Sequence, residues 1–187
     1  GLSSLPYQST DTPHPIGVYG TSKLAGEAAV QKAFLEVGCS PKHWVFRVAW
    51  LYDCVGKNFL TTMLGLIEKT SPLRVVSDQW GAPTAVGPFA SMLIDCIEVP
   101  KRLPEGVWHY GTEGPTNWHA FANAIFELSD VEQVVLPCSS SEYPTKARRP
   151  SYSYLDPLPL MTALGRQASP WKDELQQCLA ELNRMKR

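Results

Sequence analysis

The ten residues from 43 to 52, with the sequence HWVFRVAWLY, constrain the fold of this chain more than any other segment. They are apolar almost throughout and show no regular alternation of polar and apolar positions. A strand with one face in water alternates, whereas a strand of a parallel sheet is covered on both faces and is apolar along its length. The segment therefore predicts a buried strand in a fold that combines helices with a parallel sheet.

Helical and extended patterns alternate along the rest of the chain, which indicates an α/β fold. The expected helices cover residues 19–37, 58–69 and 86–99, a fourth is opened by Thr116, and the last starts at Ser169 and Pro170. Further short strands are expected at 73–76 and 107–110. The residues spaced to face the core are Leu24, Ala28 and Leu35 in the first helix, and Phe89, Leu93 and Ile97 in the third.

The composition excludes several classes of protein. With 187 residues, of which 44% are hydrophobic, the chain can bury a core and is neither disordered nor fibrous. Its net charge of -1 argues against nucleic acid or an anionic membrane as a partner, although local clusters can still hold a small anion. No apolar stretch is long enough to span a bilayer, and the first residues lack the pattern of a signal peptide. We therefore expect a cytoplasmic protein without a membrane segment.

The cysteine pattern also favours a cytoplasmic protein. They are odd in number and widely scattered, at Cys39, Cys54, Cys96, Cys138 and Cys178. None forms a C-x-x-C pair, and none has a histidine nearby at ligand spacing. This pattern predicts buried reduced thiols and no metal site. The four histidines show no H-E-x-x-H motif and no nucleophile partner, so surface or hydrogen-bonded core positions are expected for them.

A candidate for acid catalysis lies at the start of the first expected helix. Tyr19 and Lys23 are four residues apart, so they share one helical face. An ammonium group beside a phenol favours the phenolate, and a tyrosine in that setting can donate a proton near neutral pH. The spacing is weak evidence alone, because an ordinary helix start with an exposed lysine produces it as well.

Further blocks turn this spacing into a resemblance. The chain carries Tyr19–Glu27, Phe46–Tyr52, Asn58–Phe59, Asp78–Thr84 and Tyr143–Pro150 in the order in which dTDP-4-dehydrorhamnose reductases carry them. It resembles the C-terminal part of that family, which belongs to the extended short-chain dehydrogenase/reductases. The resemblance implies the C-terminal part of a doubly wound, Rossmann-type parallel sheet plus a small α/β substrate-binding lobe. On this basis residues 1–70 belong to the NAD(P)-binding domain, and 71–187 mainly form the lobe, with one segment returning to the Rossmann part.

The resemblance also implies a reaction, namely reduction of the 4-keto group of dTDP-4-dehydro-L-rhamnose to dTDP-L-rhamnose by NADPH or NADH. Tyr19 would protonate the substrate, and Lys23 would hydrogen-bond the nicotinamide ribose and assist Tyr19. Trp50, Arg148 and Arg149 would bind the dTDP-sugar, with one of the two arginines expected on the diphosphate. A core position for Trp50, and a structural loop at Asp78–Thr84, remain open alternatives. A homodimer is compatible with the resemblance.

Two features of the family are not found in these 187 residues. No glycine-rich G-x-G-x-x-G turn follows a strand, and the Ser or Thr that completes the catalytic triad is expected upstream of Gly1. We therefore expect a piece of a longer protein that is inactive by itself. Two other functions stay open, namely another nucleotide-sugar epimerase or dehydratase and a non-catalytic regulatory subunit resembling the methionine adenosyltransferase β subunit. The later blocks and Trp50 favour the reductase.

Overall fold

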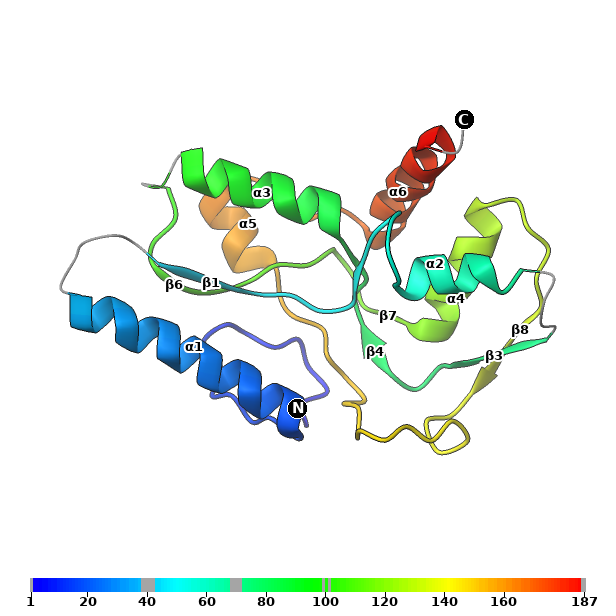
Figure 1. Ribbon diagram of the computed structural model, residues 1–187, viewed down its shortest axis with the longest axis horizontal. Helices are drawn as coiled ribbons and strands as arrows, with labels where there is room; N and C mark the ends of the chain where they lie inside the picture. The colour runs from blue at the N-terminus through cyan, green and yellow to red at the C-terminus, as the bar shows by residue number, and fades with distance from the viewer. Residues whose placement is uncertain (1, 38–42, 68–71, 99, 101, 186–187) are drawn as a thin grey trace.

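The computed structural model describes residues 2–37, 43–67, 72–98, 100 and 102–185. At its centre a pair of parallel strands, β1 (Trp44–Arg47) and β6 (Gly106–His109), lies between α1 (Val18–Val37) on one side and α3 (Val86–Glu98) and α5 (Leu158–Leu164) on the other (Figure 1). Helices on both sides of parallel strands form the doubly wound arrangement that the apolar segment predicts. In the described part of the chain, no helix has both the length and the apolar character needed to cross a membrane.

The other strands form three more pairs. β2 (Leu51–Tyr52) runs parallel to β5 (Thr84–Ala85), and β3 (Leu73–Val76) runs parallel to β8 (Val135–Cys138). β4 (Trp80–Gly81) is antiparallel to β7 (Thr116–Asn117). Three of the four pairs are thus parallel, which confirms the expected α/β class. The remaining helices are α2 (Phe59–Gly65), α4 (Trp118–Leu128) and α6 (Trp171–Met185).

Side-chain caps explain where two of the helices begin. Asn58 caps α2, because its side chain accepts a hydrogen bond from the Thr61 backbone N–H at 3.2 Å while the Thr61 hydroxyl accepts one from the Asn58 N–H at 3.1 Å. Asn117 caps α4 and accepts from the Ala120 N–H at 2.8 Å. The expected opening of this helix by Thr116 is therefore wrong by one residue, since Thr116 belongs to β7.

The expected strand at 43–52 is wrong in one respect. It is broken between β1 and β2, where Trp50 has a φ of 51°, a left-handed conformation that is unusual for any residue except glycine. Such a residue cannot continue a strand. The chain turns there, and β2 pairs with β5 instead of continuing beside β6.

Three expected inward positions are exposed. Leu35 on α1 is 83% exposed, and Ile97 on α3 is 71% exposed. On α3 the buried side chains are Met92 and Cys96, and Phe89 and Leu93 of the predicted stripe are partly buried beside them. The outer side of α1 is not covered within the described residues, and Ala28 is exposed as well. Helix α5 and the short strands β4, β5, β7 and β8 were not expected from the sequence.

The buried side chains gather into two hydrophobic cores. The first, called here the α2–α4–α6 core, contains Leu60 of α2, Phe121 of α4 and Leu175 of α6 together with residues of β2, β3 and β5. The second, called the α3–α5 core, contains Met92 of α3 and Leu160 of α5 and packs against β1 and β6. The two cores interleave along the sequence, since the chain leaves the first at β5, passes through α3 and β6, and returns to the first at α4.

Candidate functional site

A cleft of about 1050 Å³ brings most of the predicted site residues together. Tyr19, Trp50, Arg148 and Arg149 all line it. Its sides are residues 14–20, called here the α1 wall, and residues 143–150, called here the basic loop. Between them lies an aromatic floor, defined by Trp50, Phe59, Met63 and Trp118. Lys23 is not part of the lining.

Tyr19 stands at the open end of the cleft. Its side chain is 74% exposed, and it is the second residue of α1, on a face that also carries Lys23. The Lys23 Nζ lies 5.5 Å from the centroid of the Tyr19 ring, so the ammonium and the phenol ring are neighbours as the spacing predicts. An exposed phenol at a cleft edge can reach a ligand without the backbone having to move.

Polar contacts hold α1 against the strands. The Arg47 guanidinium donates two hydrogen bonds to the Glu27 carboxylate, from Nε to Oε1 at 2.8 Å and from Nη2 to Oε2 at 2.6 Å. This bidentate pair joins the middle of α1 to the end of β1, and the hydrogen bond to Glu27 raises the pKa of Arg47. Farther along the helix, Phe34 stacks on His43 with ring centroids 4.8 Å apart. The position of Tyr19 therefore depends on contacts about two and four turns away from it along α1.

Trp50 forms the aromatic floor with a second tryptophan. Its indole stacks on Trp118 with ring centroids 3.7 Å apart and an interplanar angle of 13°. Gly81 makes this packing possible, because a Cβ at that position would lie 2.6 Å from the Trp50 Cε2 and 2.7 Å from the Ser153 Oγ. The Trp50 carbonyl accepts a hydrogen bond from the Thr84 N–H, which fixes its turn to β5. Trp50 is half-buried, so one part of its surface packs and the rest faces the cleft.

The charge of the cleft differs from that of the whole chain. Four of its lining residues are cationic, and none of the described residues that line it is acidic, although the chain carries a net charge of -1. The cationic residues are Arg74, Lys146, Arg148 and Arg149. Arg74 is held by Glu142 at 2.6 Å, whereas the other three form no ion pair with any residue that the structure describes. Such a concentration of positive charge suits an anionic ligand.

The block Asp78–Thr84 supports this cleft from behind. The Asp78 carboxylate accepts hydrogen bonds from the backbone N–H and the hydroxyl of Ser140, and Gln79 donates to the same hydroxyl at 2.9 Å. These bonds fix the start of the segment that leads to the basic loop. In the middle of the block, the Trp80 N–H donates to the Ser151 carbonyl at 2.8 Å, and the Trp80 carbonyl accepts from the Ser153 N–H at 2.7 Å. Gln79 is the one member of the block that lines the cleft, and the block also contains β4 and the first residue of β5.

Some lining residues were missed by the sequence reasoning. Trp118 was not singled out from the sequence, since its place along one side of a helix is the same for a core residue and for a floor residue. Arg74 was missed because nothing near it in the sequence points to a ligand. Lys146 lies within a block noted for its resemblance, and its charge was the available signal. Two histidines are hydrogen-bonded within the fold, as expected. The buried His109 contacts the Tyr7 carbonyl, and His119 contacts the Val135 carbonyl.

Similar proteins identify the family. The family described as RmlD substrate binding domain matches residues 1–184. The dTDP-4-dehydrorhamnose reductase of Salmonella typhimurium is 38% identical over 164 residues, which cover 83% of this chain and 53% of that protein. A dTDP-4-dehydrorhamnose reductase from Clostridium acetobutylicum superposes with a TM-score of 0.86 at 32% identity, over 97% of this chain and 61% of that one.

A second solved structure, the reductase from Bacillus anthracis in complex with NADP, has a TM-score of 0.82 at 32% identity and covers 94% of this chain and 59% of that one. The chain thus spans between half and two thirds of the length of these relatives. The family matches nearly all residues of this chain. The chain therefore belongs to the RmlD substrate binding domain family.

Proposed function

We propose that the protein that carries this chain reduces the 4-keto group of dTDP-4-dehydro-L-rhamnose to dTDP-L-rhamnose with NADPH or NADH. The observation that carries the proposal is the meeting of Tyr19 with a basic loop in one cleft. A nucleotide-diphosphate sugar needs cations for its diphosphate, and reduction of its ketone needs a proton donor for the new hydroxyl group. The choice of substrate is supported by similar proteins that are named dTDP-4-dehydrorhamnose reductase.

The residues at the α1 wall fit the nicotinamide end of the cofactor. Tyr19 lines the cleft and Lys23 lies beside it outside the lining, and the phenol and the ammonium can both hydrogen-bond ribose hydroxyls. A reduced nicotinamide supplies the hydride in this chemistry. Nothing in these 187 residues has the glycine-rich pattern that holds a pyrophosphate, so we assign no residue of this chain to that part of the cofactor.

Tyr19 acts in this proposal as the general acid. As the carbonyl carbon becomes tetrahedral, negative charge grows on its oxygen, and the Tyr19 hydroxyl donates its proton to that oxygen. Lys23 stabilises the resulting phenolate, since an ammonium group beside the ring favours the negative form. The pair is exposed and reloads its proton from solvent after each turnover.

The rest of the cleft binds the substrate. Arg148 and Arg149 both line it, and we propose that at least one of them holds the diphosphate with charge-assisted hydrogen bonds. Trp50 offers its free surface to the sugar, since a flat apolar face suits the faces of a pyranose ring. We keep the division into a Rossmann part before residue 70 and a substrate lobe after it as an approximate proposal. Residue 70 itself lies outside the described residues, and α2, before it, packs with the later elements.

The reaction is tested with the full-length protein, dTDP-4-dehydro-L-rhamnose and NADPH, while cofactor oxidation is followed by absorbance. We expect one NADPH consumed for each dTDP-L-rhamnose formed, and a much slower reaction with a UDP-linked 4-keto sugar. Conversion between UDP-sugars without net consumption of NADPH would instead indicate an epimerase. A protein that binds nucleotide without any turnover would favour a regulatory subunit. A cytoplasmic location belongs to the same proposal and agrees with the free thiols of Cys54, Cys96, Cys138 and Cys178.

The two arginines can be separated by binding measurements. Replacing the arginine on the diphosphate by alanine removes a charge-assisted hydrogen bond, which corresponds to a rise in the Kd of dTDP-rhamnose of roughly 10- to 150-fold. The affinity for NADPH should stay the same. Calorimetry on Arg148→Ala and Arg149→Ala measures both values, and Arg102→Ala, an exposed arginine outside the cleft lining, is the matched control. Unchanged dTDP-rhamnose affinity in both variants would contradict the assignment.

A further inference from the structure

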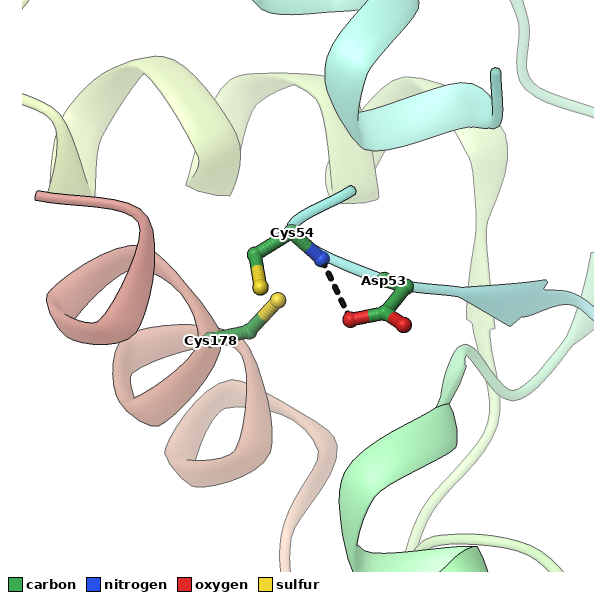
Figure 2. A group of neighbouring side chains, drawn as sticks. All are labelled: Asp53, Cys54 and Cys178. Atoms are coloured by element: carbon green, nitrogen blue, oxygen red, sulfur yellow. Dashed lines mark hydrogen bonds between the residues drawn. The ribbon is translucent and has the colours of Figure 1, made fainter. Parts of the chain in front are cut away.

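Three side chains with metal-binding atoms meet where the loop after β2 contacts α6. Asp53 and Cys54 lie on that loop and Cys178 lies on α6, and one donor atom from each lies within 4.8 Å of the other two. In Figure 2 the two sulfur atoms face each other, and the Asp53 carboxylate stands beside them on the loop. None of the three lines the cleft described above. Because Cys54 and Cys178 are far apart in the sequence, their spacing gave no sign of this cluster.

A fourth donor of the same chemical character lies next to them. The Met185 Sδ is 3.9 Å from the Cys54 Sγ. Met185 and Cys178 are seven residues apart on α6, about two turns, and therefore lie on the same face of the helix. Two thiols, a thioether and a carboxylate are a donor set that soft and borderline cations prefer over magnesium or calcium.

The cluster is held in place before any ligand binds. The Asn58 side chain donates to the Asp53 carbonyl at 2.8 Å and to the Val55 carbonyl at 3.1 Å, which stiffens the loop. The Cys54 N–H donates to the Asp53 Oδ1 at 2.7 Å, so Oδ2 is the oxygen left for a ligand. On the other side, Cys178 lies between the buried Leu175 and Leu179 of the α2–α4–α6 core. A site whose donors are fixed by packing loses little entropy on binding.

The charges around the two thiols favour a cation. Burial raises the pKa of Cys54, and it raises the pKa of Cys178 to about 12. Asp53 and Glu181 lie near both thiols and are acidic, and each raises these pKa values further, while Tyr52 faces Cys178 as a neutral phenol. Two carboxylates beside the thiols make this part of the structure attractive to a positive charge.

We propose that Asp53, Cys54 and Cys178 form a binding site for a tetrahedral d¹⁰ cation, with Zn²⁺ as the natural choice and Met185 or water as the fourth ligand. Zinc with sulfur at about 2.3 Å and oxygen at about 2.0–2.2 Å places neighbouring ligand atoms roughly 3.5–3.8 Å apart, so the observed donors need only a small contraction. On binding, each thiol loses its proton to water and forms one metal–sulfur bond, so two protons leave per ion. The bound ion links α6 to the β2–α2 loop.

The test measures Zn²⁺ binding to the reduced full-length protein, with a chromophoric chelator as competitor. We expect one ion per chain in the wild type and an affinity about 100-fold lower in Cys178→Ser, because a structural zinc site divides its binding free energy among few ligands. Cys96→Ser is the matched control, since Cys96 is equally buried and its thiol lies 3.4 Å from the Met92 Sδ, without a second thiol partner in the described structure. This control should bind Zn²⁺ like the wild type.

Two further measurements separate a metal site from two thiols that merely pack together. Cd²⁺ should produce the ultraviolet absorption of cadmium–thiolate bonds in the wild type and in Cys96→Ser but not in the Cys54→Ser/Cys178→Ser double variant. Zinc should raise the Tm of the wild type and should do so less in Asp53→Asn, which keeps both thiols in place. The proposal is overturned if Zn²⁺ binding is not saturable, if Cys178→Ser binds like the wild type, or if Cd²⁺ gives no thiolate absorption.

Discussion

The α1 wall and the aromatic floor enclose the same cleft, but they are built in opposite ways. On the α1 wall, Tyr19 is 74% exposed and Val18 is 87% exposed, and α1 is joined to β1 by the Glu27–Arg47 ion pair. The floor is packed: Trp50 stacks on Trp118, and the aromatic contacts continue through Phe59 and Phe121 into the α2–α4–α6 core. In this cleft the reactive groups are placed where solvent and ligands reach them, while the shape is set by the core.

This difference suggests that activity and stability can be changed independently. A change on the α1 wall removes a functional group but little buried surface, so it should lower activity without unfolding the protein. A change in or behind the floor disturbs packing, so it should lower stability first. The following variants test this separation from the largest expected effect to the smallest.

Replacing Tyr19 by phenylalanine should have the largest effect. The hydroxyl is lost but the ring remains, and a general acid contributes about 10²- to 10⁴-fold to the rate, so kcat should fall by that factor. The Tm should stay within about one degree, because the lost atom is exposed. Lys23→Met should lower kcat and also raise the KM for NADPH, since in the proposed reaction its ammonium assists Tyr19 and hydrogen-bonds the nicotinamide ribose. Steady-state kinetics in the full-length protein separate the two effects, and a Tyr19→Phe enzyme of nearly normal kcat would remove Tyr19 from the chemistry.

Glu174, in the packed interior, should dominate the pH dependence of the folding stability. It is only 4% exposed, and burial raises its pKa to about 7, although the Ala85 N–H at 3.2 Å partly opposes this. Between about pH 4.5 and 7 the folded protein therefore keeps a proton that the unfolded chain has lost, and stability falls as the pH rises through this window. Across this pH window the free energy of unfolding should fall by roughly 3 kcal/mol.

The measurement for Glu174 compares urea unfolding of the wild type and of Glu174→Gln at several pH values. The glutamine variant should gain stability relative to the wild type as the pH rises from 4.5 to 7, and the gain should level off above that. Asp173→Asn, an exposed neighbour on the same helix, serves as the control and should show no such trend. A constant difference in unfolding free energy between Glu174→Gln and the wild type across this range would show that burial does not raise the pKa of this carboxyl.

Gly81→Ala should damage the floor directly. The new methyl group would lie 2.6 Å from the Trp50 Cε2 and 2.8 Å from its Cζ2, so the indole must shift, at a cost of about 1–3 kcal/mol. The control is Gly87→Ala in α3, where the space around a new Cβ is open and the helix gains about 0.5–1 kcal/mol. Denaturant unfolding gives both values, and tryptophan fluorescence reports the movement of Trp50. Equal stability of the two variants would mean that the floor adapts more easily than its packing indicates.

Glu27→Gln should have the smallest effect and tests the attachment of α1. It weakens a partly buried bidentate pair, which corresponds to about 1 kcal/mol of stability. Because α1 carries Tyr19, a modest fall in kcat should accompany this loss. Glu36→Gln provides the control on the same helix, since its pair with Lys32 is exposed and contributes little. If both variants unfold at the same denaturant concentration, α1 is held by other contacts.

The elements with regular patterns were predicted well, and those fixed by distant contacts were not. The strand β3 and the helices α1 and α3 lie where their patterns placed them, to within a residue at the ends that the structure describes. The break at Trp50 could not be foreseen, because a left-handed tryptophan depends on the opening that Gly81 leaves for its indole. Leu35 fits the helical period but has no partner in the described structure that would cover it.

The same distinction applies to the candidate site. Spacing alone pointed to Tyr19 and Lys23, because four residues make one helical turn and the pair depends on no other segment. The resemblance was needed for Trp50, Arg148 and Arg149, since their joint position on one cleft depends on how the whole chain folds. The Cys54–Cys178 cluster joins two segments far apart in the sequence, so only the folded structure reveals such a pair.

The interleaving of the two cores has a consequence for the order of folding during synthesis. The α3–α5 core lacks Leu160 until α5 has left the ribosome, and the α2–α4–α6 core lacks Leu175 until α6 has followed. Neither core is complete until its late helix has been synthesised. Apolar segments made earlier, such as the one around Phe46, therefore stay exposed until late in translation. We therefore expect a nascent chain that stops before residue 158 to remain open to proteases and to depend on chaperones, although it already contains Tyr19, Trp50 and the basic loop.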